Sequence, residues 1–180
     1  HFVSRESYRQ KTDHEFLQNW TDKLGSCRIV PEGGAGLPGL LGAGEMVQTD
    51  EPFDWIILPG GTGTSAAGIA QKLEKSLSKV LCFQVLKGEQ ILQQELSKHG
   101  FDSSNYPNLK FNIDFHFGGY AKSKPELIAF QQHWMEQTEI PIDLVYGAKA
   151  LFGLYALYIE QKLGNKKSIV YIHTGGLGPN

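Results

Sequence analysis

Leu58-Pro-Gly-Gly-Thr-Gly-Thr-Ser65 is the stretch that decides the fold, because it joins a buried strand to a turn rich in glycine and hydroxyl groups. The apolar run 53–58 before it is typical of a parallel strand that is covered on both faces. Residues 65–78 after it predict a helix. Such a strand, turn and helix direct the N–H groups of the helix N-terminus at one place, where an anion is stabilised.

Further strands and helices alternate on both sides of this unit. We expect strands at 28–31, 80–86, 110–117 and 168–173, and helices at 13–24, 38–49, 88–99, 125–137 and 148–163. This alternation predicts an α/β fold of three layers, α/β/α, with a mainly parallel sheet. A ligand of such a fold lies beyond the carboxyl ends of the strands.

Composition narrows the class of partner. The chain has 180 residues and a net charge of −2, with 17 basic and 19 acidic side chains interspersed along it. Neither nucleic acid nor a membrane is implied, and a small molecule is the expected partner. Cys27 and Cys82 lie far apart and outside any metal or redox spacing, which favours the reducing cytoplasm. The chain starts at His1 without an initiator Met, so we expect a segment upstream.

The residues of the central turn have the properties of a phosphate site. Gly61 and Gly63 allow close backbone approach, and the hydroxyls of Thr62, Thr64 and Ser65 can donate to phosphate oxygens. The run from Gly61 to Ala66 also matches the dinucleotide fingerprint G-x-G-x-x-G/A, so an NAD(P)-binding oxidoreductase stays open. The acidic residue that binds the ribose in such enzymes has no counterpart at 86–88, where the next strand is expected to end.

Six short blocks occur in the same order as in a known family. The chain resembles the pyridoxal-phosphate (PLP) enzymes that include 1-aminocyclopropane-1-carboxylate deaminase and D-cysteine desulfhydrase, which have the tryptophan synthase β-like fold, fold type II. The blocks are Ser4–Arg9, Pro31–Gly34, Gly61–Gly68, Phe115–Lys122, Pro141–Lys149 and Ile172–Leu177. The resemblance extends over nearly the whole chain. It implies a large PLP-binding domain, with part of the small domain in about residues 1–50.

The resemblance also implies roles for individual residues. The stretch Gly61–Ser65 would hold the PLP phosphate, and Thr174 and Gly175 would lie near the pyridine nitrogen. Tyr120 and Tyr146 match two tyrosines that approach the substrate, where a phenol with a depressed pKa can act as acid or base. The implied activity is a deaminase or lyase that converts a small amino acid, a D-amino acid among the candidates, or a 1-aminocyclopropane-1-carboxylate-like substrate into a 2-oxo acid and ammonia. Family members are commonly homodimers.

Two departures from the family pattern limit that expectation. Gly147 stands where the deaminase has Glu and the desulfhydrase usually has Thr, which argues against cyclopropane ring opening and leaves the desulfhydrase-like interpretation as the better one. The motif of the Schiff-base lysine does not occur in the sequence, so we expect this chain alone to be inactive and to be the C-terminal part of a parent of about 300 residues. A non-catalytic phosphate-binding relic stays open as an alternative. For His116 and His173 we expect structural roles, and for Lys122 and Lys149 either structural ion pairing or electrostatic closing of the pocket.

Overall fold

The computed structural model describes residues 1–48, 53–164 and 168–175, and the chain forms two compact units, His1–Val30 and Pro31–Asn180. The first unit contains α1 (Arg5–Tyr8) and α2 (His14–Leu24). Helix α2 begins where the sequence predicts, because the Asp13 carboxylate accepts the Glu15 N–H at 3.2 Å. It ends at Leu24, and Gly25 after it has a φ of 79°, which a residue without Cβ adopts readily.

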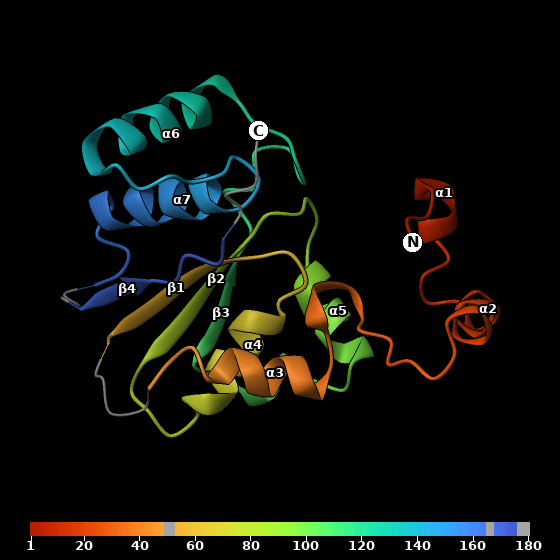
Figure 1. Cartoon of the computed structure of the whole chain (residues 1–180). Coiled ribbons are helices and arrows are strands. Elements are labelled where there is room, and N and C mark those ends of the chain that lie inside the picture. The colour runs from red at the N-terminus through yellow and green to blue at the C-terminus, as the bar shows by residue number, and fades with distance from the viewer. Residues whose placement is uncertain (49–52, 165–167, 176–180) are drawn as a thin grey trace. The chain divides into compact units, whose positions relative to one another are not determined.

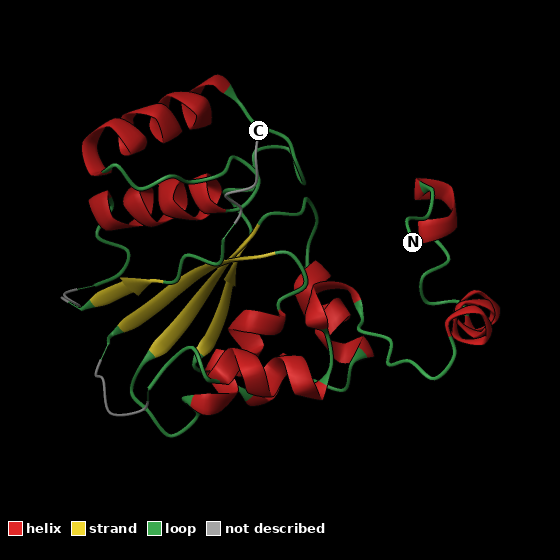
Figure 2. Cartoon of the chain, in the orientation of Figure 1, coloured by secondary structure: helices red, strands yellow, loops and turns green. Residues whose placement is uncertain are grey.

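The second unit contains a sheet of four parallel strands (Figures 1 and 2). They are β1 (Trp55–Gly60), β2 (Lys79–Gln84), β3 (Leu109–Asn112) and β4 (Ile169–Tyr171), in the spatial order β3-β2-β1-β4. In the register, Ile57 pairs with Leu81 on one side and with Tyr171 on the other. The parallel α/β sheet expected from the sequence is therefore confirmed.

Helices cover both faces of this sheet (Figure 1). One face carries α3 (Leu37–Gly44), α4 (Thr64–Lys72) and α5 (Ile91–Lys98), and the other carries α6 (Pro125–Thr138) and α7 (Gly147–Ile159). The strand residues alternate accordingly, with Ile56 and Leu58 in the core of the first face and Ile57 in that of the second. Every residue of β1 is buried, as its unbroken apolar sequence predicts.

Glycine sets how closely α3 and α4 approach each other. A Cβ on Gly68 of α4 would lie against the carbonyl oxygen of Leu40 and 2.8 Å from the Cβ of Ala43, both in α3. The two helices therefore touch backbone to backbone, which is the tight packing that the small residues of α3 indicate. This contact keeps α3 in the same unit as the sheet.

Some expected elements are absent or shorter. Residues 28–31 form no strand, and Val30 there is 73% exposed, so its apolar side chain has no sheet to join. Strand β3 stops at Asn112 because the side-chain oxygen of Asn112 accepts the Asp114 N–H at 3.0 Å and turns the chain. Helix α7 ends at Ile159 rather than at 163, ahead of Gln161 with its φ of 55°.

Strand β2 ends at Gln84 rather than at 86, and the other differences are at helix ends on the first face, where α5 begins at Ile91 rather than at 88. Helix α4 ends at Lys72 and not at 78, because Ser76 and Ser78 bond to each other in a turn that leads into β2. Helix α3 ends at Gly44; Thr49, the expected end, lies outside the described residues, as do Gly176 and Leu177 of the last sequence block. None of the described helices has the length and apolar composition needed to cross a bilayer.

Candidate functional site

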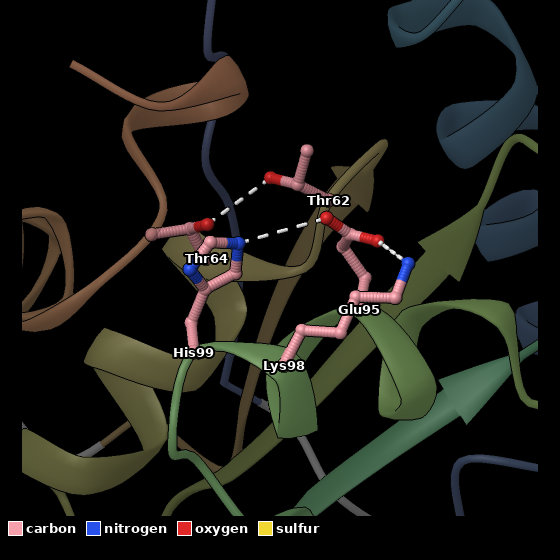
Figure 3. Close-up of polar contacts among 5 residues, drawn as sticks. All are labelled: Thr62, Thr64, Glu95, Lys98 and His99. Atoms are coloured by element: carbon pink, nitrogen blue, oxygen red, sulfur yellow. Dashed lines mark hydrogen bonds and ion pairs between the residues drawn. The ribbon is translucent and has the colours of Figure 1, made fainter. Parts of the chain in front are cut away.

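The glycine-rich turn leaves β1 at its carboxyl end and leads directly into α4. Gly63 is the N-cap of α4, with a φ of 82°, and no side chain caps this helix end. The hydroxyls of Thr62 and Thr64 lie 3.1 Å apart within the turn (Figure 3), and Thr64 is buried. An uncapped helix N-terminus with adjacent hydroxyls has the donors and the positive potential that a phosphate needs. We call residues Gly61–Ser65 the cradle.

Two neighbouring segments fix the cradle in place. A Cβ on Gly63 would lie 3.2 Å from Cδ1 of Leu96 in α5, so a side chain at this position would press against that leucine. A Cβ on Gly33, in the short 3-10 turn η1 (Glu32–Gly34), would lie 2.5 Å from Oγ1 of Thr62. The Leu96 side chain therefore packs on Gly63 of the cradle, and the Thr62 side chain of the cradle packs on the backbone of Gly33.

Helix α5, whose Leu96 lies beside Gly63, carries Glu95 and Lys98, and His99 follows it directly (Figure 3). Glu95 accepts from Lys98 at 2.7 Å and lies 3.7 Å from Nε2 of His99. The Lys98 hydrogen bond, aided by the charges of Lys98 and His99, lowers the pKa of Glu95 although partial burial opposes this. The carboxylate is therefore neutralised locally by its own helix.

The two tyrosines expected at the site do come together, and one of them lies over the cradle. A Cβ on Gly61 would be 3.0 Å from the hydroxyl oxygen and 3.1 Å from Cε1 of Tyr146, so the phenol packs directly on this glycine. The ring of Tyr120 meets that of Tyr146 edge to face, with centroids 6.0 Å apart and an interplanar angle of 72°. Tyr120 is 57% exposed, which makes it the more accessible member of the pair.

The protonation of Tyr146 differs from the sequence expectation. Burial, followed by the neighbouring Tyr120 phenol and the Asp143 and Glu32 carboxylates, raises the pKa of Tyr146 to about 12. The expectation of a depressed pKa is wrong for this tyrosine, because the phenol is partly buried and the charged groups near it are negative rather than positive. Tyr146 is thus a neutral phenol at ordinary pH, suited to donate a hydrogen bond or a proton.

Asp143 orients Tyr146, and the sequence reasoning missed it. Its carboxylate accepts three backbone N–H groups, from Val145 at 2.8 Å, from Tyr146 at 2.7 Å and from Gly147 at 2.9 Å. These bonds fix the residues where α7 begins, and Tyr146, at the N-cap position, makes no capping bond with its own side chain. The sequence feature that could have identified it is an Asp shortly before the predicted start of a helix, which is typical of an N-terminal helix cap.

The strand exit at Thr174 lies at the same edge of the sheet. The Ile172 N–H donates to the Ile57 carbonyl at 2.8 Å, which continues the pairing of β4 with β1, and Thr174 follows two residues later in an exposed position. The exit is bound to the segment before α7, because Nε2 of His173 lies 2.9 Å from the Pro141 carbonyl oxygen. The Gly175 N–H donates to Nδ1 of His173 at 3.2 Å, so this histidine has a structural role, as expected.

The arrangement fits a phosphorylated organic cofactor better than a metal ion. Within the described ranges, no group of three or more His, Cys, Asp or Glu side chains could hold a metal. The cradle, in contrast, combines an uncapped helix N-terminus with two paired hydroxyls and with glycines that exclude side chains. These features fit the phosphate of PLP, with the tyrosine pair beyond it to face the rest of the molecule.

Comparisons with known proteins agree with this arrangement. No protein-family model matches the chain. A protein of Pyrococcus furiosus, provisionally named a 1-aminocyclopropane-1-carboxylate deaminase, is 32% identical over 98% of this chain and 58% of its own length. The D-cysteine desulfhydrase of Serratia proteamaculans is 25% identical over 82% of this chain and 50% of its own length. The chain thus spans about half the length of the curated relatives it matches.

A solved structure shows the same fold. The crystal structure of a homologue of 1-aminocyclopropane-1-carboxylate deaminase superposes with a TM-score of 0.71 at 24% identity, over 98% of this chain and 57% of that one. The four parallel strands and their two helix layers are therefore a segment of a known enzyme fold.

Proposed function

Because this chain belongs to the family of 1-aminocyclopropane-1-carboxylate deaminase and D-cysteine desulfhydrase, we propose that its Pro31–Asn180 unit supplies the PLP site of an enzyme acting on small amino acids. The observation that carries the proposal is the packing of the Tyr146 phenol on Gly61 of the cradle. This contact places a proton donor directly beside an anion site, so that one small molecule can reach both. Neither feature alone would distinguish PLP from other phosphate compounds.

In this proposal the cradle binds the phosphate of PLP. The N–H groups at the start of α4 and the hydroxyls of Thr62, Thr64 and Ser65 are the donors, and the helix dipole favours the negative charge. Thr174, just beyond β4, is the proposed neighbour of the pyridine nitrogen. A neutral hydroxyl there accepts or donates a hydrogen bond without adding charge.

The reaction we propose for the whole protein has three parts: a base removes the α-proton of the amino acid, the β-substituent leaves with its bonding electron pair, as sulfide from a cysteine-like substrate, and water hydrolyses the remaining unsaturated product to a 2-oxo acid and ammonia. PLP, when bound, supplies a ring that withdraws the electron pair left by the departing proton. Tyr146 holds its own proton across the physiological range and orients or protonates a substrate group beside it. Tyr120 is the accessible partner that closes the other side of that position.

Position 147 favours elimination of the desulfhydrase kind over opening of a cyclopropane ring. A Cβ on Gly147 would lie 3.2 Å from Oδ2 of Asp143 and 3.4 Å from Cβ of Ile142. The Thr usual in the desulfhydrase would meet the same contact, but the Glu of the deaminase would also place a second negative charge beside the Asp143 carboxylate, which would repel it. We therefore propose a small amino acid with a leaving group on its β-carbon, such as a D-cysteine-like thiol, as the substrate.

Calorimetric titration of the 180-residue chain tests the proposal. We expect PLP to bind, inorganic phosphate to compete with it, and pyridoxal, which lacks the phosphate, to bind at least about 10-fold more weakly because it loses the charge-assisted hydrogen bonds. NAD should not compete with PLP. The variants Thr62→Val and Thr64→Val should weaken PLP binding, and Thr138→Val, at the end of α6, should not.

Two results would contradict the proposal. The first is equal affinity for PLP and pyridoxal, which would show that the phosphate is not recognised. The second is binding of PLP that Thr62→Val leaves unchanged, which would put the phosphate outside the cradle. Release of sulfide from D-cysteine by the whole protein is the measurement that then tests the substrate.

A further inference from the structure

Tyr120 lies in a tight turn with an unfavourable backbone. The Lys122 N–H donates to the Gly119 carbonyl at 3.1 Å, which closes a four-residue turn with Tyr120 as its second residue. Ala121, the third residue, has a φ of 53°, and Phe117 just ahead of the turn has the same value. Residues other than glycine rarely adopt a positive φ. Such a conformation is kept where contacts with the surrounding residues hold it in place.

The ammonium of Lys149 contacts the carbonyl that closes this turn. Its Nζ donates to the Gly119 oxygen at 2.7 Å, so this one oxygen receives both the Lys149 and the Lys122 donors. Lys149 belongs to α7 and follows Tyr146 by three residues, or about one helical turn. The bond therefore connects the turn that carries Tyr120 to the helix that begins beside Tyr146.

Lys149 is buried to an unusual degree for a charged residue. Its side chain is fully buried, and among the buried side chains of the described ranges it is the one that carries a charge. Burial lowers the pKa of Lys149, while the nearby Asp143 carboxylate opposes that shift. An ammonium is costly to bury unless it forms strong hydrogen bonds, so its bond to a carbonyl is a specific feature rather than incidental contact.

A second contact limits where the turn can move. A Cβ on Gly119 would lie 3.3 Å from Cβ of Lys87, so the Gly119 backbone packs against the segment that follows β2. The Gln84 amide fixes that segment by donating to the carbonyls of Leu86 at 2.8 Å and of Gly88 at 2.6 Å. Gly119 is thus placed from one side by packing and from the other by the Lys149 ammonium.

We infer that Lys149 is a positioning residue: through the Gly119 carbonyl it holds the turn of Tyr120 against α7 and so sets the edge-to-face contact between Tyr120 and Tyr146. Its importance for catalysis rests on the proposed function, because only there does the tyrosine pair act on a substrate. The positioning of Tyr120 by Lys149 is a property of this chain and does not depend on the proposed function. Lys149 acts on the reaction through Tyr120 and touches no reacting atom itself.

Nuclear magnetic resonance of the full chain tests the inference with the variant Lys149→Met, which keeps an apolar side chain of similar length and removes the charge. We expect the nuclear Overhauser effect between the Tyr120 and Tyr146 rings to fall to less than about half. Amide exchange at Lys122 should accelerate by roughly 10- to 100-fold, the effect of losing a hydrogen bond to a charged group. Exchange in β1, at Ile57 for example, should change by less than about 3-fold.

The control is Lys122→Met, which removes an exposed lysine from the same turn and should leave the ring contact unchanged. An unchanged ring contact and unchanged exchange at Lys122 in Lys149→Met would overturn the inference. If that variant does not fold, the wild-type chain decides. The Lys149 ammonium protons must then be visible and coupled to the Gly119 carbonyl carbon, and rapid exchange of these protons with water would also overturn it.

The PLP titration separates this inference from the proposed function. If the wild-type chain binds no PLP, the proposed function fails, while the ring contact in Lys149→Met still decides whether Lys149 positions Tyr120. If PLP binds equally to wild type and Lys149→Met while the ring contact is lost, both ideas stand, because the cradle and the turn are separate elements.

Discussion

Replacing Asp143 by Ala removes the acceptor of three backbone N–H groups at the start of α7. Loss of one capping side chain costs about 0.5–2 kcal/mol of stability. Asp143 is half-buried and accepts three bonds of 2.7 to 2.9 Å, so we place Asp143→Ala at the upper end, about 2 kcal/mol. For a unit of this size that lowers Tm by about 4–8 °C.

The variant Asp143→Asn refines the same prediction. Its carbonyl oxygen can replace Oδ1 and keep the bonds from Val145 and Tyr146, but its amide nitrogen would face the Gly147 N–H, donor against donor. We expect a loss of about 1 kcal/mol. The pKa of Tyr146 should fall in this variant, because one of the carboxylates that raise it becomes neutral.

Urea unfolding followed by circular dichroism measures these losses, and Asp102→Ala is the matched control. Asp102 also accepts the N–H two residues ahead, that of Ser104 at 2.9 Å, but in a short exposed turn. Its removal should cost clearly less than that of Asp143, because a capping bond in an exposed turn lies at the low end for such side chains. A loss for Asp143→Ala no larger than that for Asp102→Ala would refute the view that Asp143 holds the start of α7.

Three further predictions concern the cradle, a cysteine and α5. Gly63→Ala should lower the free energy of unfolding by about 1–2 kcal/mol and weaken phosphate binding, because φ is 82° and Leu96 lies 3.2 Å from the new Cβ. Gly100→Ala is the control in the same urea assay. Its φ is 79° but its surroundings are open, so it should show only the cost of the backbone conformation. Thiol titration of the folded chain should detect the exposed Cys27 and not the buried Cys82, because burial raises the pKa of the Cys82 thiol to about 12. Reaction of both cysteines without denaturant would contradict this prediction. The pKa of Glu95 is lower in the folded chain than in the unfolded chain. Its ion pairs therefore stabilise the fold at pH values above the pKa of unfolded glutamate, and this stabilisation is lost as the pH falls through the pKa of folded Glu95. Glu95→Gln should therefore cost about 0.5 kcal/mol at neutral pH, and the difference from wild type should vanish in acid; a difference that persists there would contradict the pairing.

The sequence predicted the fold wherever the hydrophobic pattern was long. The apolar run of β1 and the periodicity of α2 and α6 located these elements within a few residues. It was wrong where a local side-chain bond ended an element. The Asn112 side chain turns the chain after β3 although the alternation of apolar residues continues to Phe117. Alternation alone predicts neither such a bond nor the isolation of Ile29 and Val30 from any sheet.

The site divides in a similar way. Glycines and hydroxyls at a strand end predicted the cradle, because that chemistry is local to one turn. The contact of Tyr146 with Gly61 joins residues 85 positions apart, and nothing in either segment states that they meet. The bond from Lys149 to Gly119 was missed for a further reason. A lysine is expected at the surface, and the acceptor is a backbone carbonyl, which has no signature in the sequence.

The cradle and the tyrosine pair belong to opposite sides of the sheet, since α4 covers one face and α7 the other (Figure 1). Gly61 is the point at which a residue of the cradle touches a side chain from the α7 side. This division offers a plan for engineering. Under the proposed function, a library confined to residues 119–122 would vary the substrate side of the site without changing a residue that contacts the cradle. Gly61 is the position to leave unmutated, because a side chain there would displace both the cradle and Tyr146.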